Sequence, residues 1–112
     1  MQLKDKMVGD ILVLCPISSS IDASVSILFK GQIVDWIQKG YQRIVLDLSE
    51  VEFMDSSGLG VVISLTKTTS RKDSLVLCNL HKAVRNLFRI TRFDLVISIY
   101  DSLDDACRNM NH

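Results

Sequence analysis

The sequence has few of the features that mark membrane and exported proteins. No uninterrupted apolar run comes near the roughly 20 residues that a helix needs to cross a bilayer. The segment Met1 to Lys6 is polar and lacks the apolar core of a signal peptide. We therefore expect a chain that stays in the cytoplasm and does not insert into a membrane.

Cysteine and histidine are scarce. The three cysteines, Cys15, Cys78 and Cys107, are an odd number, and each lies in an apolar pattern. We expect them to be small core residues in a reducing compartment rather than disulfide partners. The chain has no CxxC pair, and its two histidines, His81 and His112, are isolated in the sequence. We therefore expect no metal site and no bound cofactor.

An excess of charge of one sign is also absent. Thirteen Lys and Arg residues balance thirteen Asp and Glu residues, so the net charge gives no basis for binding nucleic acid or an anionic membrane. The composition is that of an ordinary globular protein, with 47% hydrophobic and 23% charged residues in a chain of 112. This length supports one hydrophobic core, and we expect a single domain over residues 1–112.

The first half of the chain predicts a hairpin, a helix and a central strand. Residues 3–8 and 11–14 flank a Gly-Asp turn, and Pro16 is expected to end the second strand. Residues 23–39 have helical spacing, with Asp22 or Ser24 as the N-cap. Gly31 inside this helix suggests a close approach to the sheet. Residues 43–48 are apolar on nearly both faces, as in a covered central strand.

The second half of the chain alternates strands and helices. Strands are predicted over residues 74–80 and 95–100, with a short helix around Val84 to Phe88 between them. A final helix follows, with Asp101 or Ser102 as its cap. This alternation predicts an α/β fold of a small, mostly parallel sheet with an N-terminal hairpin strand and about four helices.

The segment Phe53 to Gly60 carries the densest functional signal. A predicted loop over residues 49–54 leads into Asp-Ser-Ser-Gly, and a helix starts at once, so Asp55 or Ser56 is expected to cap it. In an open α/β sheet such a turn lies outside the carboxyl ends of the strands, where ligands bind. A cap alone would explain these residues, but a cap is also compatible with a functional site.

Three kinds of chemistry could use this turn. A serine hydrolase needs a GxSxG elbow and a histidine. The sequence has no such elbow, and its only internal histidine is His81, so a hydrolase is disfavoured. A phosphate-binding loop needs a lysine directly after its glycine, whereas Lys67 lies farther along the helix. A hydroxyl at a helix start is instead a good phosphoacceptor, because the helix dipole and free amides would tolerate the phosphate.

Five stretches together resemble the STAS domain family of bacterial anti-sigma factor antagonists. The central block is Val51 to Val61, which contains the Asp-Ser-Ser-Gly turn, and it follows the strand Ile44 to Leu48. The resemblance continues through Leu77 to Leu80 and Ala83 to Thr91, and it closes with Leu103 to Ala106. The resemblance implies a protein-binding switch with a STAS fold and not an enzyme.

The resemblance also implies partners and roles for particular residues. The partners would be an anti-sigma factor that is a serine kinase, and a metal-dependent serine phosphatase that reverses its action. By position in the motif, Ser56 would be the phosphoacceptor, with Asp55, Ser57 and Gly58 beside it on the partner-binding surface. Asp22 would close the loop before the first helix and lie near the same surface. The family also suggests a monomer.

Two positions depart from the family pattern. Ser19 stands where a glycine is common before the first helix, and Arg92-Phe93 stands where Gly-Leu is frequent. A left-handed conformation at Arg92 would cost about 1 kcal/mol relative to glycine, so both loops are expected to differ. The alternative function is a STAS module of another regulatory complex or of a lipid-transport complex.

Overall fold

The computed structural model describes residues 1–69 and 74–110. His112 therefore lies outside the described residues. The elements follow one another along the chain as β1 (Gln2–Val8), β2 (Ile11–Ile17), β3 (Ser20–Ile21), α1 (Ser26–Gln38), β4 (Ile44–Asp47), β5 (Phe53–Met54), α2 (Ser56–Thr66), β6 (Leu75–Cys78), α3 (Lys82–Ile90), the 3-10 turn η1 (Phe93–Leu95), β7 (Ile99–Tyr100) and α4 (Leu103–Met110).

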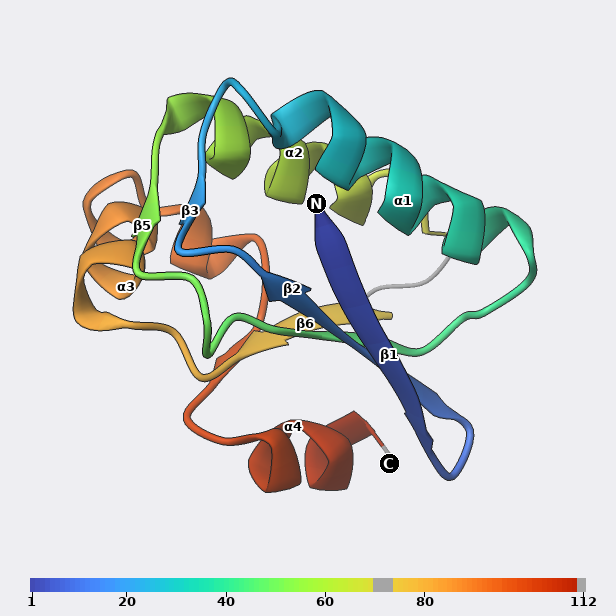
Figure 1. Cartoon of the computed structure of the whole chain (residues 1–112). Helices are drawn as coiled ribbons and strands as arrows, with labels where there is room; N and C mark the ends of the chain where they lie inside the picture. Colours follow the sequence, from blue (N-terminus) through green and yellow to red (C-terminus); the bar gives the residue numbers. More distant parts are fainter. Residues whose placement is uncertain (70–73, 111–112) are drawn as a thin grey trace.

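The main sheet has the strand order β1-β2-β4-β6-β7. Only β1 is antiparallel to its neighbour, and the other described pairs in this sheet are parallel. Helices α1 and α2 lie side by side over one face of the sheet, and α4 covers the other face (Figure 1). The predicted α/β fold, with a mostly parallel sheet, an N-terminal hairpin strand and four described α-helices, is confirmed.

The central strands are buried on both faces, as expected for parallel strands between helices. Side chains alternate along each strand, so neighbouring residues enter different cores. The larger core lies under α1 and α2, and its buried residues from the main sheet are Leu12, Leu14, Ile44, Leu46, Leu75 and Leu77. The smaller core lies under α4 and contains Ile11, Val13, Val45, Val76, Cys78, Ala106, Cys107 and Met110.

Two of the three cysteines, Cys78 and Cys107, are core residues as predicted, whereas Cys15 belongs to neither core. All three are free; Cys78 and Cys107 are buried, and Cys15 is half-buried at the end of β2. Burial raises the pKa of each thiol above its ordinary value, and that of Cys78 reaches about 12. These thiols therefore remain protonated and unreactive at neutral pH, which suits core residues.

Two predicted strands have different limits in the structure. Pro16 does not end β2, which continues to Ile17 with Pro16 buried opposite Leu3. The neighbour β4 pairs with β2 only as far as Leu14, so the missing N–H of Pro16 breaks no ladder bond on that side. The strand predicted over residues 95–100 is mostly wrong, because η1 occupies its start and only β7 pairs with β6.

The predicted start of the first helix is also wrong. Helix α1 begins at Ser26 and has Val25 at its N-cap position, without a side-chain capping bond. The prediction for Gly31 fails as well, because a Cβ there would meet no atom within 4 Å. Gly40 does adopt a left-handed conformation, with φ of 100°, directly after the C-cap of α1.

Candidate functional site

A two-stranded parallel sheet, separate from the main one, assembles the site. Strand β3 pairs with β5, Ser20 opposite Phe53 and Ile21 opposite Met54. The two strands run side by side at one end of the molecule, and each leads toward a helix start (Figure 1). Each strand has only two residues, too few to show an alternating apolar pattern. The sequence therefore predicts residues 49–54 wholly as loop. This pairing brings Asp22 and Asp55 together.

Asp55 connects the start of α2 to the loop before α1. Its Oδ1 accepts hydrogen bonds from the backbone N–H of Ser57 at 2.9 Å and of Gly58 at 3.1 Å. Its Oδ2 accepts a third bond, from Ala23 N at 3.2 Å. Asp55 is therefore the N-cap of α2, which confirms one of the two predicted caps, and Ser56 is the first helical residue.

Asp22 stabilises the turn that precedes α1 rather than the helix itself. Its Oδ1 accepts from the N–H of Ser24 at 2.9 Å and from the hydroxyl of Ser24 at 2.5 Å, and its Oδ2 accepts from the hydroxyl of Ser20 at 3.4 Å. The hydroxyl and backbone N–H of Ser24 favour the carboxylate form and hold the pKa of Asp22 below its usual value.

Gly58 is fixed by a close contact with β3. A Cβ at this position would lie 2.4 Å from the carbonyl oxygen of Ile21 and 2.8 Å from Cγ of Met54. The close approach that the sequence suggested at Gly31 is therefore at Gly58. Only glycine lets the first turn of α2 pack this closely on β3.

Ser56 is exposed, whereas Ser57 is half-buried. The hydroxyl of Ser56 has no hydrogen-bond partner among the described residues. Three of the amides at this helix start are not free, because Ser57 N and Gly58 N donate to the Asp55 side chain and Leu59 N donates to the Asp55 carbonyl oxygen. An anion on Ser56 would thus meet the Asp55 carboxylate without gaining these three amides.

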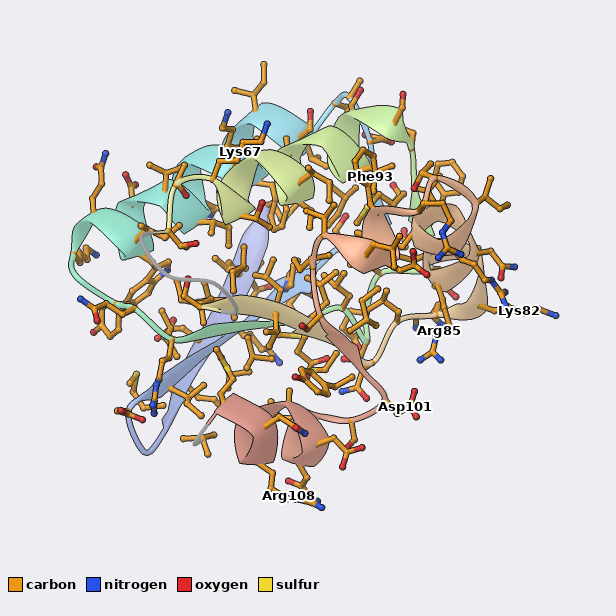
Figure 2. The ribbon with its side chains drawn as sticks, turned by 180° about the vertical axis from the view of Figure 1, so that it is seen from behind. Lys67, Lys82, Arg85, Phe93, Asp101 and Arg108 are labelled. Atoms are coloured by element: carbon orange, nitrogen blue, oxygen red, sulfur yellow. The ribbon has the colours of Figure 1, made fainter. Side chains whose placement is uncertain are left out.

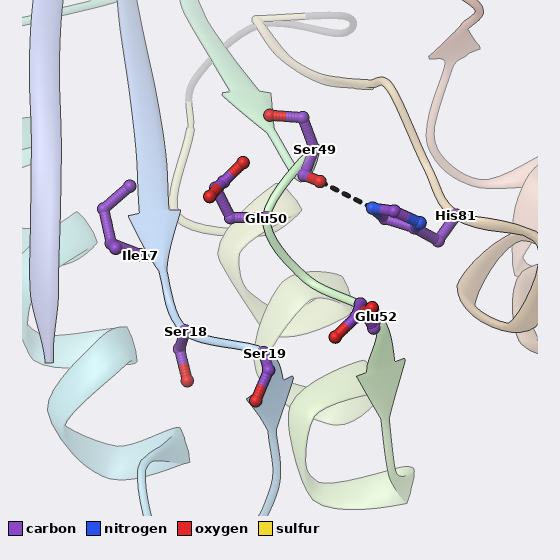
Figure 3. Close-up of a pocket in the computed structure, with 7 residues that line it drawn as sticks. All are labelled: Ile17, Ser18, Ser19, Ser49, Glu50, Glu52 and His81. Carbon is purple, nitrogen blue, oxygen red and sulfur yellow. Dashed lines mark hydrogen bonds between the residues drawn. The ribbon is translucent and has the colours of Figure 1, made fainter.

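An open pocket of about 500 Å³ lies beside this corner, past the carboxyl ends of β2 and β4 (Figure 3). His81 crosses from the start of α3 to the loop after β4, with Nε2 2.5 Å from the carbonyl oxygen of Ser49. No motif in the sequence points to this pocket, although its residues follow predicted strands. Its lining residues are Ile17, Ser18, Ser19, Ser49, Glu50, Glu52 and His81.

A polar network supports the loop between β4 and β5. Oδ1 of Asp47 accepts from the N–H of Ser49 at 3.1 Å and from Nδ2 of Asn79 at 3.2 Å. Asn79 is left-handed, with φ of 58°, a conformation that asparagine tolerates better than most residues. The network ties the ends of β4 and β6 to the loop that leads into β5.

The two departures from the family pattern have different outcomes. The carbonyl oxygen of Ser19 accepts from Glu52 N at 2.8 Å and from Phe53 N at 3.1 Å, so this position acts through its backbone. Arg92 adopts the left-handed conformation, with φ of 61°, despite its side chain. The cost of about 1 kcal/mol expected for this conformation at arginine therefore does not prevent the turn from forming.

Neither a metal-binding cluster nor a membrane-spanning helix is found in the part of the chain that the structure describes. Residues 1–69 and 74–110 contain no group of three or more His, Cys, Asp or Glu side chains that could hold a metal ion. Within the same residues, every helix is too short or too polar to cross a membrane.

The architecture and the site together define the class of protein. A mostly parallel sheet with an antiparallel edge strand lies between helices and places an Asp-Ser-Ser-Gly turn at a helix start. A model of the STAS domain family matches residues 3–106. The chain belongs to the STAS domain family, as its motifs predict.

The chain is also similar to named proteins. A Thermotoga neapolitana protein named "Putative anti-sigma factor antagonist TM1081 homolog" is 33% identical over 103 residues, 90% of each chain. The anti-sigma F factor antagonist of Paenibacillus polymyxa is 31% identical over 88 residues, which cover 77% of this chain and 75% of that protein. A Thermotoga maritima protein of known crystal structure, named a "putative anti-sigma factor antagonist", has 30% sequence identity to this chain. The two structures superpose with a TM-score of 0.88 over 98% of this chain and 95% of that one.

Proposed function

We propose that this chain is an anti-sigma factor antagonist that acts in the cytoplasm as a binding switch and not as an enzyme. Its partner is an anti-sigma factor with serine kinase activity, which inactivates it by phosphorylating Ser56, and a metal-dependent serine phosphatase restores it. The observation that carries the proposal is the exposed Ser56 hydroxyl, without a partner among the described residues, next to the Asp55 cap. The names of the relatives support the same function.

The proposed docking surface is the corner formed by the two loops that follow β3 and β5. It contains Asp22, Asp55, Ser56, Ser57 and the backbone of Gly58. The hydrogen bond from Ala23 N to Asp55 makes this corner one preformed surface instead of two independent loops. A preformed surface loses little conformational entropy when a partner binds.

Phosphorylation would change the charge of this corner without a compensating contact in the chain. A phosphoserine at position 56 adds about 1.5 to 2 negative charges beside the carboxylate of Asp55. The N–H groups of Ser57 and Gly58, which could otherwise bind a phosphate, already donate to Asp55. A partner would have to desolvate this added charge, so its affinity falls unless it supplies a cation.

The exposures of the two hydroxyls favour Ser56 as the phosphoacceptor. Ser56 is exposed at the first helical position, and Ser57 is half-buried at the second. Incubation with the cognate kinase and ATP should add one phosphate, which fragment-ion mass spectrometry should place on Ser56. Phosphate on Ser57, or none from a kinase that binds the chain, would contradict the assignment.

Calorimetric titration of variants against the kinase tests the switch. Ser56→Ala should bind about as tightly as the unmodified chain, because it removes one exposed hydroxyl. Ser56→Asp should bind about thirtyfold more weakly, which corresponds to about 2 kcal/mol for an unpaired charge at the interface. Thr68→Asp is the control for added charge away from the corner, because Thr68 is exposed just beyond the other end of α2. This change also removes the bond from the Thr68 hydroxyl to Leu65 O, so its folding should be checked by far-UV circular dichroism. Equal affinities for the alanine and aspartate variants of Ser56 would refute the proposal.

A further inference from the structure

Helix α3 and the η1 turn carry a second surface feature, outside the Ser56 corner. Three cations, Lys82, Arg85 and Arg89, are separated by three and four residues on α3, the spacing that places side chains along one side of a helix. A fourth, Arg92, follows in the turn between α3 and η1. All four are exposed. Figure 2 shows Lys82 and Arg85 projecting outward from α3. Residues 82–93 contain no acidic residue.

Acidic neighbours within the chain neutralise only part of this charge. Arg85 pairs with Asp101, Nη2 to Oδ1 at 2.9 Å, and Arg92 Nε lies 3.8 Å from Asp94 Oδ1. Arg89 donates instead to the neutral side chain of Asn86. Lys82 has no ion pair among the described residues, so the stripe keeps a net positive charge.

Three aliphatic side chains are exposed next to the stripe. Ile90, at the end of α3, is 79% exposed, and Leu95 and Val96 are 75% and 55% exposed. The turn that carries Leu95 and Val96 is compact, because Leu95 N donates to Arg92 O and Val96 N donates to Phe93 O, at 3.2 and 2.9 Å. A fixed apolar patch bordered by arginines resembles the centre and rim of a protein interface.

We propose that this surface docks a partner protein through an acidic segment that also carries aliphatic side chains. The α3–η1 surface is defined here as Lys82, Arg89, Ile90, Arg92, Leu95 and Val96. None of these residues belongs to the Ser56 corner, so the proposal does not depend on the proposed switch. The chain could then hold one protein at α3–η1 and exchange another at Ser56.

The chemistry of the surface selects a protein over other occupants. Nucleic-acid interfaces are more polar than protein interfaces, and exposed Ile90, Leu95 and Val96 would gain little from phosphates. Anionic membrane surfaces attract clusters of four to eight basic residues, whereas two of the four cations here already have acidic partners. Two copies meeting through this surface would place like charges against each other, so a second copy is disfavoured.

Photo-crosslinking in the cells that produce the chain tests the proposal. A photoreactive amino acid at Leu95 should form an adduct whose crosslinked peptide, identified by mass spectrometry, is acidic and contains aliphatic residues. The same amino acid at Met7, an exposed apolar position on β1, should not form this adduct. Ser56→Asp should leave the adduct unchanged, which separates this result from a failure of the switch.

Charge reversal provides the decisive comparison. Arg89→Glu should reduce the Leu95 adduct at least tenfold. Arg108→Glu should not, although Arg108 is also an arginine in the last turn of a helix and contacts a side chain three residues earlier. Far-UV circular dichroism should show both variants folded. An adduct with lipid, nucleic acid or a second copy, an adduct that survives Arg89→Glu, or no adduct at all would overturn the proposal.

Discussion

The starts of α1 and α2 have related layouts and different construction. Each follows a two-residue strand of the β3–β5 pair, and each strand is followed directly by an aspartate. Asp55 caps α2 directly, and Gly58 packs against the backbone of β3. Asp22 stabilises a turn ahead of α1, which begins at Ser26 without a side-chain cap. The same residue type therefore serves two local structures.

The two helix starts therefore differ in how firmly they are held. At α2 the backbone is fixed by the cap and by a contact that tolerates no side chain, so Ser56 is held in a defined position. At α1 the preceding turn is held by exposed hydrogen bonds from Ser24, which solvent can replace at little cost. The turn before α1 is joined to the start of α2 through Ala23 N and Asp55, but its own hydrogen bonds give it the weaker support of the two.

The largest expected effect is at Gly58. Gly58→Ala should destabilise the fold by about 2–4 kcal/mol, because the new Cβ meets the Ile21 carbonyl oxygen and the backbone must move. Gly60→Ala is the matched control, because Gly60 lies in the same helix and a Cβ there would meet no atom within 4 Å. This variant should stabilise the fold by about 0.5–1 kcal/mol. Urea unfolding of both variants measures the difference. Equal effects would show that the start of α2 is not tightly packed on β3.

The next effect is the loss of the Asp55 cap. Asp55→Ala should lower the free energy of unfolding by about 1–2 kcal/mol, because Ser57 N, Gly58 N and Ala23 N lose their acceptor. Asp55→Asn keeps one acceptor oxygen and should retain most of this stability. Thermal and urea unfolding measure both values. If the asparagine variant is as unstable as the alanine variant, the charge and not the cap is what stabilises this corner.

A smaller effect is expected for charge at Ser56. Ser56→Asp should change the stability by no more than about 1 kcal/mol, because attraction to the helix start is opposed by the neighbouring Asp55 carboxylate. The far-UV spectrum should be unchanged. Unfolding of this variant would mean that Ser56 is needed for the fold and is unsuitable as a phosphoacceptor.

The smallest effect is the pH dependence of the turn before α1. Hydrogen bonds lower the pKa of Asp22 in the folded chain, so its contribution is present above its ordinary pKa of about 4. The contribution is lost as the pH falls through the lowered value. The small stability difference between the unmodified chain and Asp22→Asn at pH 6 should therefore shrink toward pH 3. A difference that grows on acidification would contradict the hydrogen-bonding scheme.

The sequence predicts the long helices and strands, and the residue types of the Asp22–Asp55 corner, better than it predicts how β3 and β5 bring this corner together. The Asp-Ser-Ser-Gly motif identifies the start of α2, and the alternation of strands and helices along the chain identifies the sheet, because both signals are local. Strands β3 and β5 are too short for any periodicity to appear. The sequence also does not show which glycine packs against a neighbouring backbone, so the close contact predicted at Gly31 occurs at Gly58 instead. That contact depends on residues more than thirty positions away.

Apolar composition gives a wrong prediction near the end of the chain. Leu95 and Val96 have the composition of a strand, but both are exposed, and Phe93–Leu95 forms η1 instead. The left-handed Arg92 directs the chain into this turn. The left-handed conformation costs arginine about 1 kcal/mol relative to glycine. The packing of Phe93 against the larger core can offset this cost.

Strand β1 bears on how such a chain avoids aggregation. It forms the long edge of the main sheet, with Lys4, Asp5 and Lys6 at its centre, and the opposite edge is the two-residue strand β7. Unpaired edges invite strands from other chains, and charged or very short edges discourage them. If two copies paired antiparallel about Asp5, that residue would face itself and each lysine would face another lysine. The sheet therefore resists extension at both edges.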